Sequence, residues 1–168
     1  MRNKTRHILI LIALSCLVYL IGNNMLSLTN PDEVFYAQTA KEMAQRNSWM
    51  TPYMFGQPQF EKPILLYWLM RVAYLLFGIT PFAARFFPAV FGALGVVAVY
   101  LLAQAGFKDE KKAFLCGIVT MTCGLWIGLS KTVFTDMIFS TLILFALTAF
   151  YWGYVQKDKK AAGILLFF

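Results

Sequence analysis

Charged residues are scarce in this 168-residue chain: Asp, Glu, Lys and Arg make up 14% of it, whereas hydrophobic residues make up 60%. A soluble globular domain is about one quarter charged and about half apolar. The shortage of charge therefore excludes an ordinary soluble domain. It predicts an all-α integral membrane protein whose long apolar runs are helices that cross the bilayer.

Histidine and cysteine are also scarce, which excludes several kinds of site. The one histidine, His7, lies among N-terminal basic residues with no nearby partner for catalysis. The three cysteines, Cys16, Cys116 and Cys123, all lie inside apolar runs, and no C-x-x-C or Cys/His metal pattern occurs. On one helix Cys116 and Cys123 would be about 10 Å apart, which is too far for a disulfide. We interpret the cysteines as packing residues.

The net charge of +7 comes largely from three short basic clusters. They are Arg2, Lys4 and Arg6; Lys108, Lys111 and Lys112; and Lys157, Lys159 and Lys160. The clusters flank apolar runs and form no continuous basic stripe with interleaved aromatic residues, so a nucleic-acid partner is not expected. Lys and Arg collect at the cytoplasmic ends of membrane spans. The clusters therefore predict a topology with a cytoplasmic N-terminus.

Four apolar runs are long enough to cross a hydrocarbon core of about 30 Å. They cover residues 8–28, 81–107, 113–130 and 135–155, and a shorter apolar stretch at 161–168 is interpreted as the start of a fifth span. No small-x-small cleavage site follows the first run, so we interpret it as an uncleaved span. The pattern predicts a polytopic helical bundle, of which residues 1–168 are the N-terminal part.

The apolar segment 63–77 has two interpretations. If it crossed the membrane, the second and third basic clusters would lie opposite the first. Because it is short and has Arg71 at its middle, we instead predict an interfacial helix within a first external loop of about residues 29–80. In the same loop, Asn30 and Pro31 are a helix start, which predicts a second helix to about Gln45, and residues 48–61 are expected to form a loop.

Acidic residues are few, but five of the eight fall on the predicted outer face. They are Asp32, Glu33, Glu42, Glu61 and Asp136. Asp32 and Glu33 have an ordinary explanation, because carboxylates in a first helical turn offset the helix dipole, and Asn30 with Glu33 matches a loose capping box. They also follow directly on a membrane exit, where a rigidly held carboxylate can act as general base toward a hydroxyl. On the residues alone both interpretations stay open.

Charged side chains beside the spans are candidates for a site that binds a sugar phosphate. Lys62 stands next to Glu61 at the start of the interfacial helix, and Arg85 lies one turn into the second span. Lys131 lies at the outer end of the third span, and Asp136 opens the fourth. Each has an ordinary alternative as a helix-end carboxylate, a snorkelling lysine or a headgroup anchor. Together, carboxylates and cations at one membrane face suit a sugar-phosphate donor whose lipid tail stays in the bilayer.

Six short motifs, in this order, carry a family resemblance. They are PDEVFYA at 31–37, SWMTP at 48–52, FEKP at 60–63, LYWL at 66–69, ARF at 84–86 and TDM at 135–137. The set resembles the GT-C superfamily of polyprenyl-phosphate-sugar glycosyltransferases, and within it the bacterial relatives of protein O-mannosyltransferases and the lipid A aminoarabinose transferases. The resemblance spans nearly all of this chain but only about the N-terminal third of a typical family member.

The resemblance implies three catalytic residues and a metal ligand. The family has a catalytic Asp at the start of the first external loop, which corresponds to Asp32, with Glu33 beside it. A second acidic residue at the outer start of the fourth span corresponds to Asp136. Glu61 corresponds to a residue at the cavity border that faces a metal. A divalent metal ion is thus the cofactor that the resemblance implies.

The resemblance also implies substrate-binding roles for Tyr36, Lys62 and Arg85, with Lys62 directed toward the lipid phosphate. Two positions depart from the pattern of the aminoarabinose transferases. Phe35 stands where they usually have an arginine that contributes to phosphate binding, and Ile64 stands where a second proline is often found.

The sequence therefore predicts part of an inverting glycosyltransferase, a hexosyl- or pentosyltransferase of the bacterial inner membrane with its active face periplasmic. The expected partners are a polyprenyl-phosphate-linked sugar donor and a lipid A, glycan or protein acceptor. The main alternative is a non-catalytic transporter or lipid-handling subunit, and a structural scaffold is a third interpretation. We expect residues 1–168 alone to be inactive.

Overall fold

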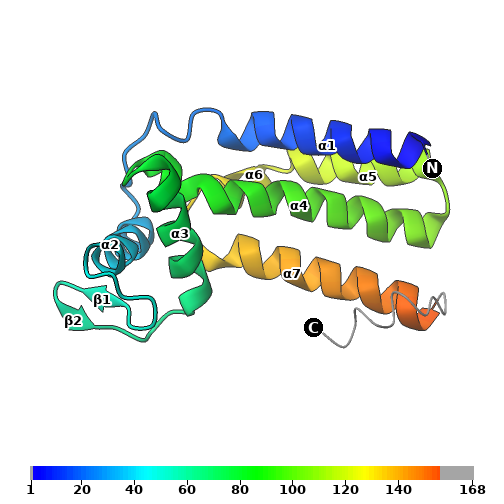
Figure 1. The fold of residues 1–168 in the computed structure, drawn as a ribbon. Coiled ribbons are helices and arrows are strands. Elements are labelled where there is room, and N and C mark those ends of the chain that lie inside the picture. Colours follow the sequence, from blue (N-terminus) through cyan, green and yellow to red (C-terminus); the bar gives the residue numbers. More distant parts are fainter. Residues whose placement is uncertain (1, 156–168) are drawn as a thin grey trace.

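Long helices running side by side, with a smaller cap at one end, make up the chain in this computed structural model, which describes residues 2–155 (Figure 1). The bundle consists of α1 (Arg2–Leu20), α4 (Pro81–Phe107), α5 (Glu110–Thr122), α6 (Gly124–Ser130) and α7 (Thr135–Phe150), which a short π-helix, η1 (Tyr151–Val155), extends. The cap consists of α2 (Pro31–Gln45), α3 (Ile64–Phe77) and a hairpin of β1 (Tyr53–Met54) and β2 (Gln57–Pro58). The predicted all-α membrane architecture is thereby confirmed.

Two predicted spans agree with the structure residue for residue. α4 covers Pro81–Phe107, and α7 with η1 covers Thr135–Val155. Thr80 caps α4 by accepting a hydrogen bond from the Ala83 amide (3.1 Å). Together with α1, these are the three helices within residues 2–155 that are long and apolar enough to cross a membrane.

The third predicted span, at 113–130, is not one unbroken helix. α5 and α6 meet at an angle of 63° across Cys123, so the pair forms at most one broken span. Cys123 has an extended backbone (φ −63°, ψ 124°), which ends the helical hydrogen-bond pattern, and Gly124 begins the next helix. The apolar run has no break in its composition at this point, so hydropathy alone gave no warning.

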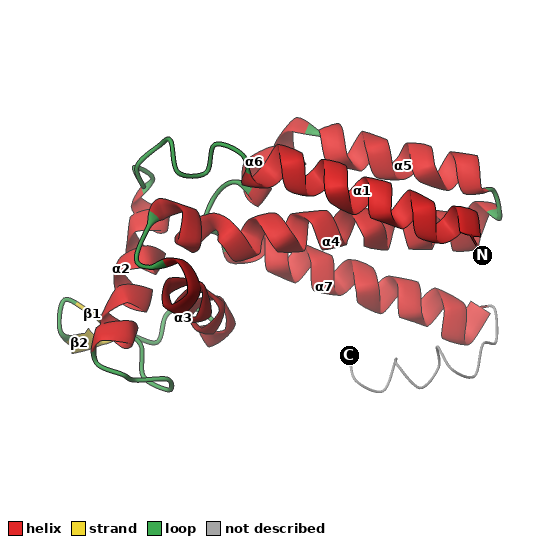
Figure 2. Cartoon of the chain, turned by 45° about the horizontal axis from the view of Figure 1, so that its top comes forward, coloured by secondary structure: helices red, strands yellow, loops and turns green. Residues whose placement is uncertain are grey.

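The predicted first span at 8–28 is also misplaced. α1 begins at Arg2 and ends at Leu20, eight residues earlier than expected. Gly22 has a positive φ of 84°, and the following residues to Asn30 form an irregular connection to α2 (Figure 2). The predicted fifth span at 161–168 and the third basic cluster lie outside the described residues.

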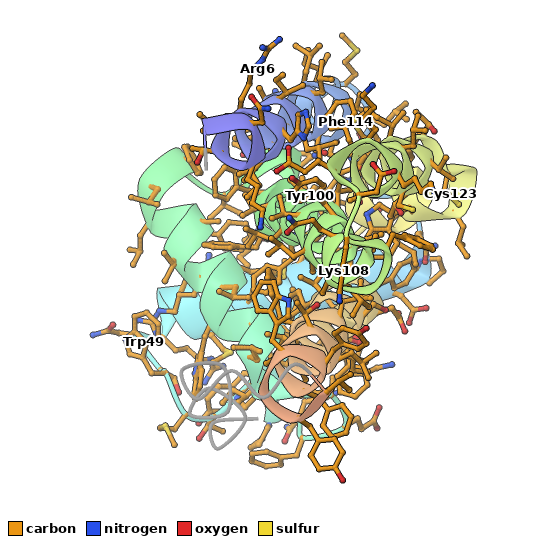
Figure 3. The ribbon with its side chains drawn as sticks, turned by 90° about the vertical axis from the view of Figure 1, so that its right-hand side faces the viewer. Arg6, Trp49, Tyr100, Lys108, Phe114 and Cys123 are labelled. Atoms are coloured by element: carbon orange, nitrogen blue, oxygen red, sulfur yellow. The ribbon has the colours of Figure 1, made fainter. Side chains whose placement is uncertain are left out.

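The first two basic clusters share the end of the bundle opposite the cap. One lies in the first turns of α1, and the other spans the junction of α4 and α5. Figure 3 looks along the bundle from this end and labels Arg6 and Lys108. His7 packs there against the ring of Phe114 (centroids 4.8 Å apart) and edge-on against Tyr100 (6.1 Å). His7 therefore packs among aromatic rings at the end of the bundle opposite the cap.

The cap has its own hydrophobic core, which fixes α2 and α3 against the start of α4. Tyr36, Met43, Tyr67 and Met70 are buried in it, together with Val133 from the connection between α6 and α7. In Figure 1, α3 runs across the long helices rather than along them. The loop expected at 48–61 contains the hairpin, which pairs Tyr53 with Pro58 and Met54 with Gln57. This core holds the charged residues of the cap at the ends of α4 and α7.

Candidate functional site

Asp32 is presented on a rigid helix start. The Asn30 side chain caps α2 by accepting a hydrogen bond from the Asp32 amide (3.0 Å), and Pro31 occupies the first helical position. These features fix the backbone at the helix start. Asp32 is exposed, and its carboxylate makes no hydrogen bond or ion pair with any of residues 2–155. A carboxylate held in this way is free to accept a proton from a bound molecule.

Glu33, the next residue, points the other way. Its side chain is 2% exposed and forms an ion pair with Arg85 (2.9 Å). One carboxylate oxygen also accepts the Arg85 Nε–H (3.0 Å) and the Val133 amide N–H (2.9 Å). The loose capping box expected for Glu33 is therefore wrong, because its carboxylate joins α2 to α4 and to the connection before α7.

Arg85 has a complete set of partners. Besides its bonds to Glu33, it donates to the carbonyls of Asn23 (3.1 Å), Leu26 (2.8 Å) and Ser27 (3.3 Å). A guanidinium group has five N–H donors, and all five are engaged. Arg85 thereby satisfies three carbonyls of the irregular segment after α1 and ties that segment to α4. The structure thus gives Arg85 protein partners where the sequence predicted a donor phosphate.

Lys62 lies among aromatic rings just before α3. Its ammonium nitrogen stands 5.8 Å from the centroid of the Tyr36 ring, and that ring packs against Tyr67 (5.8 Å). Burial raises the pKa of Tyr67 to about 12, so its hydroxyl stays protonated at neutral pH. Lys62 forms no salt bridge with any carboxylate of the described residues. It is therefore a cation without a protein counter-ion, as a phosphate-binding residue requires.

Asp136 is exposed in the first turn of α7, beside an apolar cavity of about 270 Å³ between α3 and α7. The lining of the cavity is apolar apart from Thr135 and Asp136. Its remaining lining residues are Pro63, Leu65, Leu66, Ile138, Phe139 and Leu142. The cavity therefore joins the first turn of α7 to the start of α3, in a setting that suits an apolar chain with a polar end.

Glu61 is exposed, and its amide donates to the Gln59 side chain (3.0 Å). Within residues 2–155, no three side chains of His, Cys, Asp or Glu gather in a way that could hold a metal ion. Glu61 contributes one carboxylate, so a divalent cation bound there would take its remaining oxygen ligands from water and from a substrate phosphate. These residues do not form a metal site on their own.

Glu42 and Arg71, which the sequence did not assign to the site, fix the connection between α2 and α3: Glu42 binds the hairpin turn, and Arg71 binds the segment before the hairpin. The Glu42 carboxylate accepts the amide N–H groups of Phe55 (2.8 Å) and Gly56 (3.0 Å), which both have positive φ values at the hairpin turn. These hydrogen bonds lower the pKa of Glu42, and the bond from the Gly56 amide has the largest effect. Arg71 donates to the Ser48 carbonyl and stacks on the Trp49 ring (3.9 Å). The one sequence signal was an arginine in the middle of an apolar helix.

The family described as dolichyl-phosphate-mannose-protein mannosyltransferase matches residues 4–168. Curated relatives include the undecaprenyl phosphate-alpha-4-amino-4-deoxy-L-arabinose arabinosyl transferase of Yersinia enterocolitica, which is 33% identical over 153 residues. That match covers 89% of this chain and 28% of the relative. The protein of the same description from Yersinia pestis (strain Pestoides F) is 33% identical over 135 residues, covering 80% of this chain and 24% of the relative.

Two solved structures share the fold. ArnT from Cupriavidus metallidurans bound to undecaprenyl phosphate superposes with a TM-score of 0.80 and 26% sequence identity, covering 87% of this chain and 27% of that chain. The apo state of the same protein gives the same TM-score and covers 89% of this chain. The chain thus spans less than a third of the length of these relatives.

Proposed function

Because the chain belongs to the dolichyl-phosphate-mannose-protein mannosyltransferase family, we propose that it forms the N-terminal part of an inverting glycosyltransferase. The donor is a sugar linked to a polyprenyl phosphate, and the acceptor carries a hydroxyl or phosphate group. The similar transferases are named for an undecaprenyl phosphate-linked aminoarabinose, and a similar structure is described as bound to undecaprenyl phosphate. We place the protein in the bacterial inner membrane, with the cap on the periplasmic side.

The observation that carries this proposal is the unpaired Asp32 carboxylate on a fixed helix start. In a direct displacement, the acceptor oxygen forms a bond to the anomeric carbon while the bond from that carbon to the phosphate oxygen breaks. The acceptor hydroxyl gives its proton to a base, and the polyprenyl phosphate leaves with the bonding electrons. Asp32 is the base in this scheme, because its carboxylate is exposed and has no competing partner within residues 2–155.

Lys62 is proposed to stabilise the departing phosphate. Its ammonium has no protein counter-ion among the described residues, and Tyr36 holds it by its ring face. A fixed cation at the leaving group lowers the barrier because charge develops there as the bond breaks. Asp136, beside the apolar cavity, is proposed to bind a polar group of the substrate. Glu33 and Arg85 position Asp32 through α2, and no step of this scheme requires a metal at Glu61.

The rival interpretation is a transporter or lipid-handling subunit. Transporters place ionisable residues and broken helices near the middle of the membrane. The Glu33–Arg85 pair, Lys62 and Asp136 instead lie at the cap end of the long helices. The described part of the chain does contain one broken helix, α5–α6, but no Asp, Glu, Lys or Arg stands at its break around Cys123. The two functions also differ in a measurable product, because only a transferase forms a new glycosidic bond.

Transfer of sugar from a polyprenyl-phosphate donor in membranes containing the full-length protein tests the proposal. Asp32→Asn keeps the size of the side chain but removes the base, so turnover should fall by roughly 100-fold or more while donor binding persists. Lys62→Ala should weaken donor binding. Glu110→Gln, the same change of charge on α5 at the far end of the bundle, is the matched control and should keep full activity. Near-normal transfer by a folded Asp32→Asn variant would exclude Asp32 as the base.

A further inference from the structure

A second cavity, lined by several polar side chains, lies where the segment after α1 meets α4 and the end of α6. Its volume is about 390 Å³, and its lining includes Asn23, Ser27, Arg85, Lys131 and Thr132. The apolar cavity beside Asp136 has an entirely different lining, drawn from α3 and α7. The two cavities are therefore separate sites at the same end of the molecule.

The charges in this cavity leave one cation uncompensated. Glu33 and Arg85 neutralise each other, and every N–H of Arg85 is already donated. Lys131 is half-buried and forms no salt bridge with any carboxylate of residues 2–155. One of its N–H groups donates to the Ile21 carbonyl just after α1 (2.6 Å). The other two N–H groups remain for a ligand.

Asn23 adds an unsatisfied donor. The residue is 3% exposed, and its amide nitrogen Nδ2 donates to no acceptor among the described residues. A buried donor without a partner costs about 1–3 kcal/mol. If Lys131 only capped α1, the bond to Ile21 would be explained, but the Asn23 amide would still lack an acceptor. A ligand with acceptor oxygens satisfies both groups.

We propose that Lys131 and the Asn23 side chain bind a phosphate group in this cavity, at a site distinct from the one around Lys62. A net positive cavity with free N–H donors and no free carboxylate selects an anion with several acceptor oxygens. The cavity lies at the cap ends of α1 and α4, where the proposed topology would bring it close to lipid headgroups. The phosphate can belong to an anionic lipid or be free in solution. Either one bridges the end of α1 and the end of α6 next to the Glu33–Arg85 pair.

The test uses the full-length protein in an alkyl maltoside detergent, which carries no phosphate. Thermal unfolding is followed while phosphatidylglycerol or, separately, inorganic phosphate is titrated at constant ionic strength. The wild type should be stabilised, and Lys131→Gln should bind at least about tenfold more weakly. Asn23→Leu should also bind more weakly, since it keeps the backbone carbonyl that Arg85 uses but removes the amide. Lys131→Arg and the control Lys41→Gln, on α2 outside the cavity lining, should bind like the wild type.

Stabilisation by phosphatidylglycerol alone identifies a lipid headgroup, and stabilisation by both probes identifies the phosphate group itself. The proposal is overturned if neither probe stabilises the wild type. It is equally overturned if Lys131→Gln is less stable without ligand but shows an unchanged affinity, because Lys131 then only caps α1. Asp32→Asn should bind both probes normally, so the outcome does not depend on the transfer reaction.

Discussion

Asp32 and Glu33 are adjacent in the sequence yet have opposite environments. Asp32 is exposed and unpaired within residues 2–155, whereas Glu33 is buried against Arg85. Successive residues on a helix point about 100° apart, so one faces the solvent while the other faces the bundle. The pair thus combines the exposed carboxylate that we propose as the base with a buried carboxylate that ties α2 to α4. A motif search alone treats both as catalytic; only the partner Arg85, fifty-two residues away, separates their roles.

Removing the Arg85 guanidinium should therefore damage stability more than chemistry. Arg85→Met leaves the Glu33 carboxylate buried without a counter-ion, which should lower the free energy of unfolding by about 3–5 kcal/mol. The double variant Glu33→Gln/Arg85→Met should recover part of this loss because no charge then remains buried. Thermal unfolding of the full-length protein measures both, with Lys41→Gln as control. Unchanged stability of Arg85→Met would show that the Glu33–Arg85 pair does not stabilise the fold.

The hairpin shows how one side chain can define an element. Glu42 binds the two amides of the Phe55–Gly56 turn, and Phe55 adopts a φ of 51°, which non-glycine residues rarely do. This contact joins residues thirteen and fourteen positions apart, so local propensity did not predict the two short strands. By contrast, the start of α2 at Asn30 and Pro31 was predicted, because a helix cap and the proline after it are encoded in consecutive residues.

The hairpin should loosen at acid pH. Its hydrogen bonds lower the pKa of Glu42 in the folded protein, so the folded state binds fewer protons than the unfolded state at this group. The stabilisation is therefore complete above the ordinary glutamate pKa and is lost as the pH falls through the lowered value. Fluorescence of Trp49, four residues before β1 in the sequence, should report this transition. Glu42→Gln should show the fluorescence of the loosened loop already at neutral pH, with no further change on acidification. If this variant kept the acid transition of the wild type, the transition would belong to another titrating group.

Close helix packing explains another difference between composition and structure. Gly92 on α4 lies directly against α6: a Cβ at this position would stand 2.2 Å from the Ser130 hydroxyl oxygen. The Trp126 indole also donates to the Gly92 carbonyl (3.1 Å). These contacts hold α6 against α4 beyond the break at Cys123. Hydropathy indicates only an apolar run there, because the break depends on how α6 packs against α4.

Adding a single methyl group should separate α4 from α6. Gly92→Ala should lower the free energy of unfolding by about 1–3 kcal/mol, because the new Cβ overpacks against Ser130. Gly106→Ala, in the last turn of the same helix, is the matched control, since a Cβ there meets nothing within 4 Å. It should leave stability unchanged or raise it slightly. Equal stability of the two variants would show that α6 can shift without cost.

At the scale of the whole molecule, the charges divide between the two ends of the bundle. The cap end carries Asp32, Lys62 and Asp136, and the opposite end carries the first two basic clusters (Figure 1). This division was predictable from the order of charges and apolar runs. The sequence predicted that the separate motifs share one membrane face, but it did not predict how they are arranged in the cap. Their distances in three dimensions depend on the packing of α2, α3 and α4.

Cysteine labelling of the full-length protein in intact cells should reveal the orientation of this bundle. If α3 lies in the interface and the basic clusters are cytoplasmic, a cysteine at Gln57 in the hairpin faces the periplasm. An impermeant maleimide should then label Gln57→Cys. It should miss Glu110→Cys at the start of α5 until the membrane is permeabilised. Native cysteines are replaced by serine first, since Cys123 is exposed. Labelling of Glu110→Cys but not of Gln57→Cys would show that the orientation is the reverse of the predicted one. The cap, with Asp32, would then face the cytoplasm.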